Sequence, residues 1–249
     1  MQNDGKTANY IGEAVILLTA DHLGIETEML DIAKQKDDAH YNIAKLIYSY
    51  QLNKGDKPTY ADWTFERALN EINTAIQITQ QPIYYQVQGD IYFAMQKYAE
   101  AFTAYDTVNK SSLASAATFY SSAKAKDLME GVDKKEVVAL MDSAVARFNK
   151  PYGKDAAPSL YERAGAKTAV KDFRGAVADY NDFYDAMMGQ VSAEFYLIRT
   201  QAEMQCRMFQ QAINDINKAI ELDPQNVNYW VEKGGVCLRV NQTAEAVQA

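Results

Sequence analysis

Residues able to do acid–base, nucleophilic or metal chemistry are few in this sequence and stand apart. The two histidines, His22 and His40, belong to no metal-ligand spacing with Cys, Asp or Glu, so a zinc site is not expected. Asp21 beside His22 could act as an acid and base pair, but no serine or cysteine elbow accompanies it. A surface or capping role fits this pair better. We therefore expect a chain that is not an enzyme and holds no metal and no cofactor.

The remaining chemically suggestive residues have structural explanations. Gly234-Gly235 stands in no glycine-rich phosphate-binding frame. Cys206 and Cys237 each fall inside a helical pattern, where a free cysteine commonly serves as a small buried apolar residue. A disulfide between them is the alternative, and comparing masses under reducing and non-reducing conditions would decide between the two.

The charge balance argues against two classes of partner. The 249 residues include 25 basic and 33 acidic side chains, a net charge of -8, without long blocks of one sign. Nucleic acids and anionic membranes are bound by basic stripes that neutralise phosphate groups. We therefore expect neither as a partner.

No part of the sequence predicts a membrane span. The longest clear apolar run, 14–18, is far shorter than the roughly 20 apolar residues that cross a bilayer. The polar start lacks the basic and apolar regions of a secretory signal. A soluble chain is expected. Its compartment stays unassigned, and an extracytoplasmic location remains open if Met1 replaces a removed signal peptide.

Apolar residues recur at helical spacing along the chain, in pairs of helices separated by turn residues. Asp133 with Glu136, and Ser159 with Glu162, have the capping-box spacing that predicts helix starts. The expected helices cover 10–20, 25–33, 38–52, 62–78, both sides of a turn at Gln96-Lys97, 116–130, 134–148, 159–171, 173–188, 193–207 and 209–222, with two more beginning near 228 and 243.

The pairs of helices repeat. A bulky residue in a first helix precedes a small residue in the second by sixteen positions at Tyr85 and Ala101, Leu160 and Ala176, Tyr196 and Ala212, and Trp230 and Ala246. The small residues from Ala68 to Ala246 are about 36 positions apart on average, close to the 34 of helix-turn-helix repeats. The bulky and small residues are expected to pack against one another.

These residues resemble the tetratricopeptide repeat, whose unit runs W-x2-L-G-x2-Y, then A-x3-F, then P. The resemblance spans about residues 38–249, but Ala164 and Thr200 occupy the glycine position in two units. It is carried by Tyr85, Gly89, Tyr92, Tyr98, Ala101 and Tyr105, by Trp230, Gly234 and Ala246, and by Tyr196, Ala212, Ile216, Ala219 and Pro224.

The resemblance implies an all-α, right-handed superhelical solenoid of stacked antiparallel helix hairpins, with about five to six repeats. Residues 1–37 would form an N-terminal helical cap or a degenerate repeat. The array over 38–249 would divide into units 38–81, 82–116, 117–156, 157–192, 193–226 and 227–249, the last one incomplete.

In this family the first helices line a concave groove, so the resemblance implies a scaffold that binds a protein or peptide there. The chaperone carboxylate clamp of lysine, arginine and asparagine is not present in the groove positions. Two alternatives stay open, a structural segment of a longer repeat protein and a helical binder of small molecules or glycans. The residues expected to face the groove are Gln86, Asp90, Phe93, Tyr161, Thr168, Leu197, Gln201, Met204 and Gln205.

Overall fold

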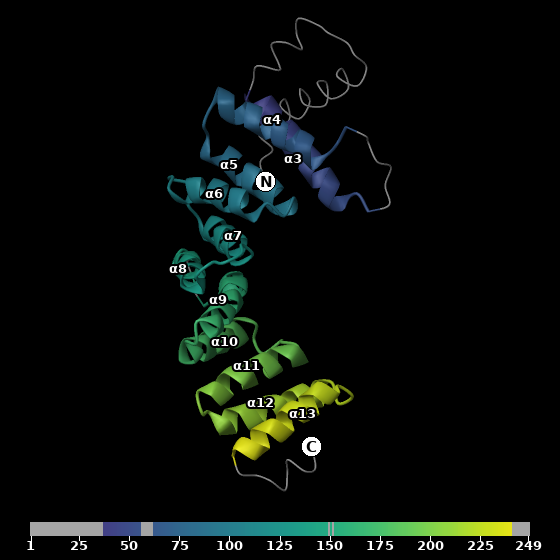
Figure 1. Cartoon of the computed structure of the whole chain (residues 1–249), viewed down its shortest axis with the longest axis vertical. Helices are drawn as coiled ribbons and strands as arrows, with labels where there is room; N and C mark the ends of the chain where they lie inside the picture. Colours follow the sequence, from purple (N-terminus) through teal and green to yellow (C-terminus); the bar gives the residue numbers. More distant parts are fainter. Residues whose placement is uncertain (1–36, 56–61, 149, 151, 241–249) are drawn as a thin grey trace, which may run out of the picture. The chain divides into compact units, whose positions relative to one another are not determined.

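The computed structural model describes residues 37–55, 62–148, 150 and 152–240 (Figure 1). Within these ranges the chain forms eleven α-helices and one short 3-10 helix and contains no strand, which confirms the predicted all-α class. The helices predicted at 10–20, at 25–33 and from 243 lie outside the described residues, as does His22.

The chain forms two compact units, residues 1–130 and 131–249. The boundary lies inside the predicted repeat 117–156. In the first unit α3 pairs with α4 and α5 with α6, and α7 packs on α6. The helices of this unit are α3 (Asp37–Asn53), α4 (Phe65–Ile78), α5 (Pro82–Ala94), α6 (Tyr98–Asn109) and α7 (Ala116–Asp127).

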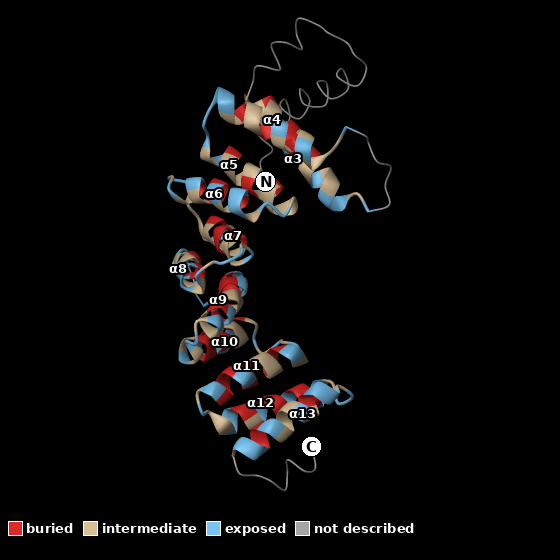
Figure 2. Ribbon diagram, viewed as in Figure 1, coloured by how far each residue is buried: buried red, intermediate tan, exposed pale blue. Residues whose placement is uncertain are grey.

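In the second unit α9 pairs with α10 and α11 with α12, while α8 packs on α9 and α13 on α12. Each of its helices buries one side and exposes the other (Figure 2). The elements are α8 (Lys134–Val145), η1 (Lys154–Ala156), α9 (Ala157–Ala169), α10 (Phe173–Ala186), α11 (Ala193–Gln205), α12 (Phe209–Leu222) and α13 (Val227–Arg239).

The predicted bulky-to-small spacing describes the core of the second unit well. Leu160 and Tyr196 are buried, and their partners sixteen positions later, Ala176 and Ala212, are fully enclosed. The alanines allow the second helix of each hairpin to approach closely, and the larger residues fill the space beside them.

In two helices the buried aromatic residue lies one position before the residue that the spacing predicts. Tyr84 and Tyr229 are buried, whereas Tyr85 and Trp230 are only half-buried. Tyr84 can be buried because its hydroxyl donates to Asp37 at 2.8 Å, which satisfies the polar end of the ring. Tyr85 is therefore not the core residue that the spacing predicts. Trp230 packs against the core of the second unit although it is only half-buried, and its expected partner Ala246 lies outside the described residues.

Gly89 is the position at which the α5–α6 hairpin requires a glycine. A Cβ built there would lie 2.5 Å from Cε1 of Tyr105, far inside van der Waals contact. The Tyr105 ring thus lies directly against the α5 backbone, and its hydroxyl donates to Asp90 at 2.8 Å. This contact confirms the close helix approach expected at Gly89.

Three hairpin turns share one backbone conformation without having glycine. Gln96, Lys171 and Arg207 each follow a first helix and have φ of 60°, 64° and 59°. The amide of the next residue donates to a carbonyl five positions earlier, as in Lys97 to Tyr92 at 2.9 Å, which closes the helix end as a Schellman motif. The left-handed conformation costs a residue with a Cβ about 1 kcal/mol.

Of the two helix starts predicted from capping-box spacing, one is confirmed and one is wrong. Asp133 is the N-cap of α8 and accepts from the backbone N–H of Lys135 at 2.9 Å, as expected for a helix start there. Ser159, in contrast, is a buried residue inside α9, which begins earlier at Ala157. Pro158 fits the first helical turn, where its missing N–H is not needed, so the helix extends through it.

We expect Gly89→Ala to lower the free energy of unfolding by about 1 to 3 kcal/mol, because the new methyl group displaces Tyr105 from α5 and from Asp90. Gly165→Ala is the matched control, since that glycine is also helical but has open space around it. The control should be more stable than the wild type by about 1 kcal/mol. Denaturant unfolding followed by circular dichroism measures both, and two equal shifts would contradict the contact.

We expect Lys171→Gly to raise the free energy of unfolding by about 0.5 to 1 kcal/mol, because glycine adopts the left-handed turn without strain. The gain is reduced by the greater freedom of glycine in the unfolded chain. Lys171→Ala retains the strain and should show no gain. The same unfolding measurement checks this, and a glycine variant no more stable than the alanine variant would contradict it.

Candidate functional site

The predicted groove residues lie on the first helices of the hairpins, α5, α9 and α11. On α5, Asp90 is half-buried and accepts from Tyr105, and burial raises the pKa of its carboxyl. Phe93 packs edge-on against Tyr98 with ring centroids 5.4 Å apart. Gln86 points its amide toward Asp90 at 3.5 Å. Asp90 and Phe93 therefore help to hold the α5–α6 hairpin together while remaining partly accessible.

In the second unit, the α9 residues of the predicted set are also half-buried. The Tyr161 ring lies 5.2 Å from Phe183 and 5.9 Å, edge-on, from Tyr180. The Thr168 hydroxyl donates to the carbonyl of Ala164 at 2.9 Å. Tyr161 thus presents one side of an aromatic ring that the core holds in place.

The α11 residues divide into a surface group and a core residue. Gln201 and Gln205 are exposed, and Leu197 is half-buried against the apolar core of this unit. Met204 is only 6 % exposed and packs with Ala212 of α12 and Val236 of α13. The structure therefore places Met204 in the core, because α13 covers this part of α11.

The last helix within the described residues, α13, carries surface residues that the sequence prediction missed. Val227, Val231 and Leu238 are 70 %, 68 % and 59 % exposed, and their spacing places them on one face of α13. Gly235 lies on the same face, is exposed, and has nothing within 4 Å of a built Cβ. The repeat spacing could have identified Val231. It lies fifteen residues before the small residue Ala246, and the predicted groove residues Tyr161 and Leu197 lie fifteen residues before Ala176 and Ala212.

Tyr161, Leu197 and Val231 thus occupy equivalent positions on α9, α11 and α13, one residue after the bulky position of each repeat. We call these three residues the apolar column of the second unit. The helices α11 and α13 contact each other. On these two helices Leu197 is half-buried and Val231 is exposed.

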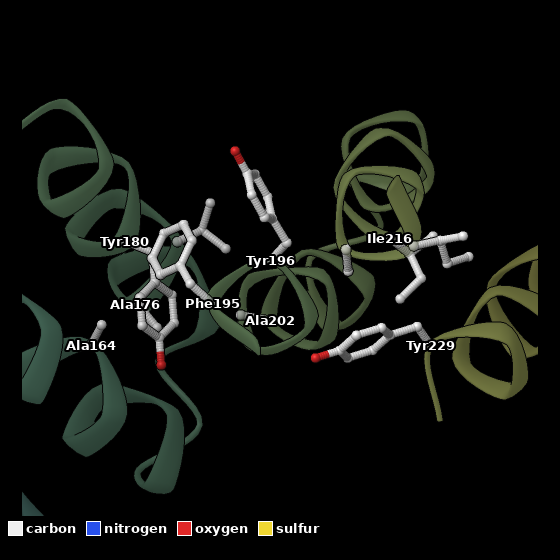
Figure 3. Packing of buried hydrophobic residues seen from close by; sticks show 11 residues of the cluster. Ala164, Ala176, Tyr180, Phe195, Tyr196, Ala202, Ile216 and Tyr229 are labelled. Carbon is white, nitrogen blue, oxygen red and sulfur yellow. The ribbon is translucent and has the colours of Figure 1, made fainter. Parts of the chain in front are cut away.

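The core beneath this surface is aromatic. In Figure 3 the rings of Tyr180, Phe195 and Tyr229 lie between helices, and Ala202 is among the small side chains near them. Phe195 packs edge-on against Tyr180 at 5.9 Å and lies tilted against Phe183 at 5.2 Å. Such ring contacts stabilise a core beyond simple burial.

A repeated ion pair joins the two helices of each hairpin in this unit, and the sequence prediction also missed it. Arg163 holds Asp179 through two N–H donors at 2.8 and 2.7 Å. Arg199 holds Asp215 in the same way at 2.6 and 2.9 Å. Both pairs are sixteen residues apart, the same spacing as the bulky and small core residues. That spacing was the available signal.

The Arg199 guanidinium is enclosed on several sides. It lies over the rings of Tyr184 and Phe195, 4.9 and 5.1 Å from their centroids. A third nitrogen donates to Asn181 on α10 at 3.1 Å. The pair therefore links α10, α11 and α12, and aromatic faces replace part of the hydration that the cation loses.

The residues considered for chemistry have structural settings. Within the described ranges no group of three or more His, Cys, Asp or Glu side chains could hold a metal ion. His40 contacts Glu71 across the α3–α4 hairpin at 2.6 Å. Cys206 and Cys237 are free cysteines, and burial raises the pKa of the Cys206 thiol, which disfavours the reactive thiolate. None of the described helices has the length and apolar character needed to cross a membrane.

Comparison with known structures identifies the fold. YrrB, described as a TPR protein with an unusual peptide-binding site, superposes with a TM-score of 0.66 at 15% identity, over 83% of this chain and 96% of its own. PilF of Pseudomonas aeruginosa superposes at 0.58 and 14% identity, over 91% and 97%. A tetratricopeptide repeat protein from Parabacteroides merdae superposes at 0.60 and 13% identity, over 84% and 77%. The chain therefore has the tetratricopeptide-repeat fold.

Sequence comparison covers less of the chain. No protein-family model matches. A curated relative, the SGT1 homolog protein of Oryza sativa subsp. japonica, is 37% identical over 93 residues, which are 36% of this chain. The matched segment spans only 25% of the length of that relative.

We expect Arg199→Met to lower the free energy of unfolding of the second unit by about 3 to 5 kcal/mol, because it leaves the buried carboxylate of Asp215 without its partner. The double variant Arg199→Met with Asp215→Leu should recover much of this loss. Lys218→Met removes an exposed pair with Glu221 and should leave unfolding unchanged. Denaturant unfolding monitored by tryptophan fluorescence in a Trp63→Phe background, which leaves Trp230 as the fluorophore, measures all three. If the free energy of unfolding of Arg199→Met is no lower than that of Lys218→Met, the Arg199–Asp215 pair does not stabilise the unit.

Proposed function

We propose that this protein is a non-catalytic scaffold that binds a protein or peptide on the face formed by the first helices of its repeats. In the second unit the binding surface is the apolar column of Tyr161, Leu197 and Val231. The observation that carries the proposal is the exposure of Val227, Val231 and Leu238 along one side of α13. Contiguous exposed apolar surface of this kind commonly marks an interaction site.

The chemistry of the surface favours an apolar partner. The aromatic ring of Tyr161 and the aliphatic groups of Leu197 and Val231 offer dispersion and burial, while the exposed amides of Gln201 and Gln205 can hydrogen-bond a main chain. An extended peptide with apolar side chains, or the apolar face of an amphipathic helix, would be complementary. The peptide-binding site named for YrrB supports the same type of partner.

An acidic tail is a poor fit to the same surface. Most of the predicted groove positions contain amide, aromatic or apolar residues, with Thr168 and the carboxylate of Asp90 in addition. The basic clamp that would hold a terminal carboxylate is not among them. The half-buried Arg163 and the buried Arg199 are already engaged by Asp179 and Asp215. The partner proposed here is therefore recognised through apolar side chains.

We expect Leu197→Lys and Val231→Lys each to weaken peptide binding at least tenfold, or about 1.4 kcal/mol, because a charge replaces apolar contact surface. Peptides selected from a random phage-displayed library against the full chain are the probes, and fluorescence polarisation measures their affinity. Met188→Lys is the control, since Met188 is 76 % exposed but lies at the end of α10. Equal affinities for all variants, or a library from which no peptide is enriched, would contradict the proposal.

A further inference from the structure

The two ion-paired hairpins of the second unit differ at one charged position. In the α9–α10 hairpin Lys167 joins the pair, with its Nζ 2.9 Å from Asp179. Each of these residues has a counterpart 36 positions later in the α11–α12 hairpin. Arg163 corresponds to Arg199, Asp179 to Asp215, and Lys167 to Glu203. A carboxyl group therefore occupies the place of the ammonium group.

Glu203 is buried without a polar partner for one of its oxygens. The residue is 4 % exposed, and its Oε2 has no hydrogen-bond partner. The nearby guanidinium of Arg199 directs its donors to Asp215 and Asn181. Burial, followed by the negative charge of Asp215, raises the pKa of Glu203 to about 8, and Arg199 offsets only part of this shift.

The titratable groups around Glu203 include one cation that offsets its ionisation, Arg199 of the same helix. The Cys206 thiol lies at the end of α11, where Arg174 and Asp172 also act on it. Asp215 comes from α12, and Tyr184 of α10 lies under the Arg199 guanidinium. From α13 come the buried Tyr229 and Cys237, and no acidic or basic side chain of that helix is buried.

We propose that Glu203 makes the second unit pH-sensitive: its uncharged carboxyl belongs to the folded packing of α11 against α12, and its ionisation loosens that packing. The folded unit holds a proton on Glu203 at neutral pH, whereas the unfolded chain has already released it. Stability is therefore complete below the ordinary pKa of a glutamic acid and falls as pH rises toward about 8.

The backbone hydrogen bonds around Glu203 determine which part of the second unit is loosened when its carboxyl ionises. Its carbonyl accepts from the amides of Cys206 and Met208, which close the turn between α11 and α12. The next residue, Met204, packs on Val236 of α13. Ionisation thus acts where the last three helices of the described chain meet.

Hydrogen exchange of the full chain, followed by mass spectrometry and corrected for intrinsic rates, tests the proposal. From pH 6 to pH 8 the protection of α11 and α12 should fall about tenfold to fiftyfold in the wild type. In Glu203→Gln, whose amide remains neutral, it should change less than about twofold. Glu194→Gln, at an exposed position of the same helix, should behave as the wild type. Parallel pH dependence of α11 in wild type and Glu203→Gln would overturn the proposal.

A second measurement follows the titration in the wild-type chain itself and uses Glu203→Gln only to assign the resonance. Carboxyl 13C chemical shifts of the glutamate-labelled wild-type chain report each titration directly, with the resonance of Glu203 identified as the one absent from Glu203→Gln. A midpoint well above that of Glu194 supports the proposal. A midpoint equal to that of Glu194 overturns it, whatever the hydrogen-exchange result.

Discussion

A two-helix hairpin has apolar residues on both of its faces, and only a neighbouring hairpin can cover them. This constraint organises each unit of the protein. The rings of Tyr180 and Phe195 fill the space between one hairpin and the next, and alanines such as Ala176 and Ala212 let the paired helices approach. Stability therefore accumulates through neighbours, as it does in repeat proteins generally.

The same constraint leaves one side of every first helix free. On α11 the buried side holds Phe195, Arg199 and Glu203, so the helix cannot move without disturbing α10, α12 and α13. Its other side presents Leu197 and Gln201, which the fold does not need for closure. A surface on such a helix is rigid because the core holds it, and a rigid surface loses little entropy when a partner binds.

Sequence reasoning predicted those features that depend on spacing and side-chain volume. The hairpins, the turn at Gln96-Lys97 and the close approach at Gly89 all follow from steric rules with few alternatives. It placed Tyr85 in the core instead of Tyr84, because the choice between adjacent tyrosines depends on a distant acceptor, Asp37. No pattern in the sequence around α5 reports that contact.

The candidate surface was less predictable than the fold. Met204 has the position of a groove residue, but α13 covers it, and coverage depends on how two repeats are packed together. Val231 was missed although the spacing that identified Leu197 extends to it. The Arg–Asp pairs were not predicted, because charged residues are mostly exposed, whereas a cation held by two hydrogen bonds and aromatic faces can be buried.

The ion pairs explain a difference between the two units. Gln88 occupies on α5 the position that Arg163 and Arg199 occupy on α9 and α11, but the residue sixteen positions later is Ala104, which cannot pair with it. Gln88 instead donates to Asn73 on the preceding helix at 2.8 Å. A bidentate Arg–Asp pair requires a particular rotation and axial position of both helices, while an apolar contact tolerates several. The second unit therefore sets the alignment of its hairpins by charge. Glu203 lies beside one of these pairs, where an added negative charge acts on the alignment itself.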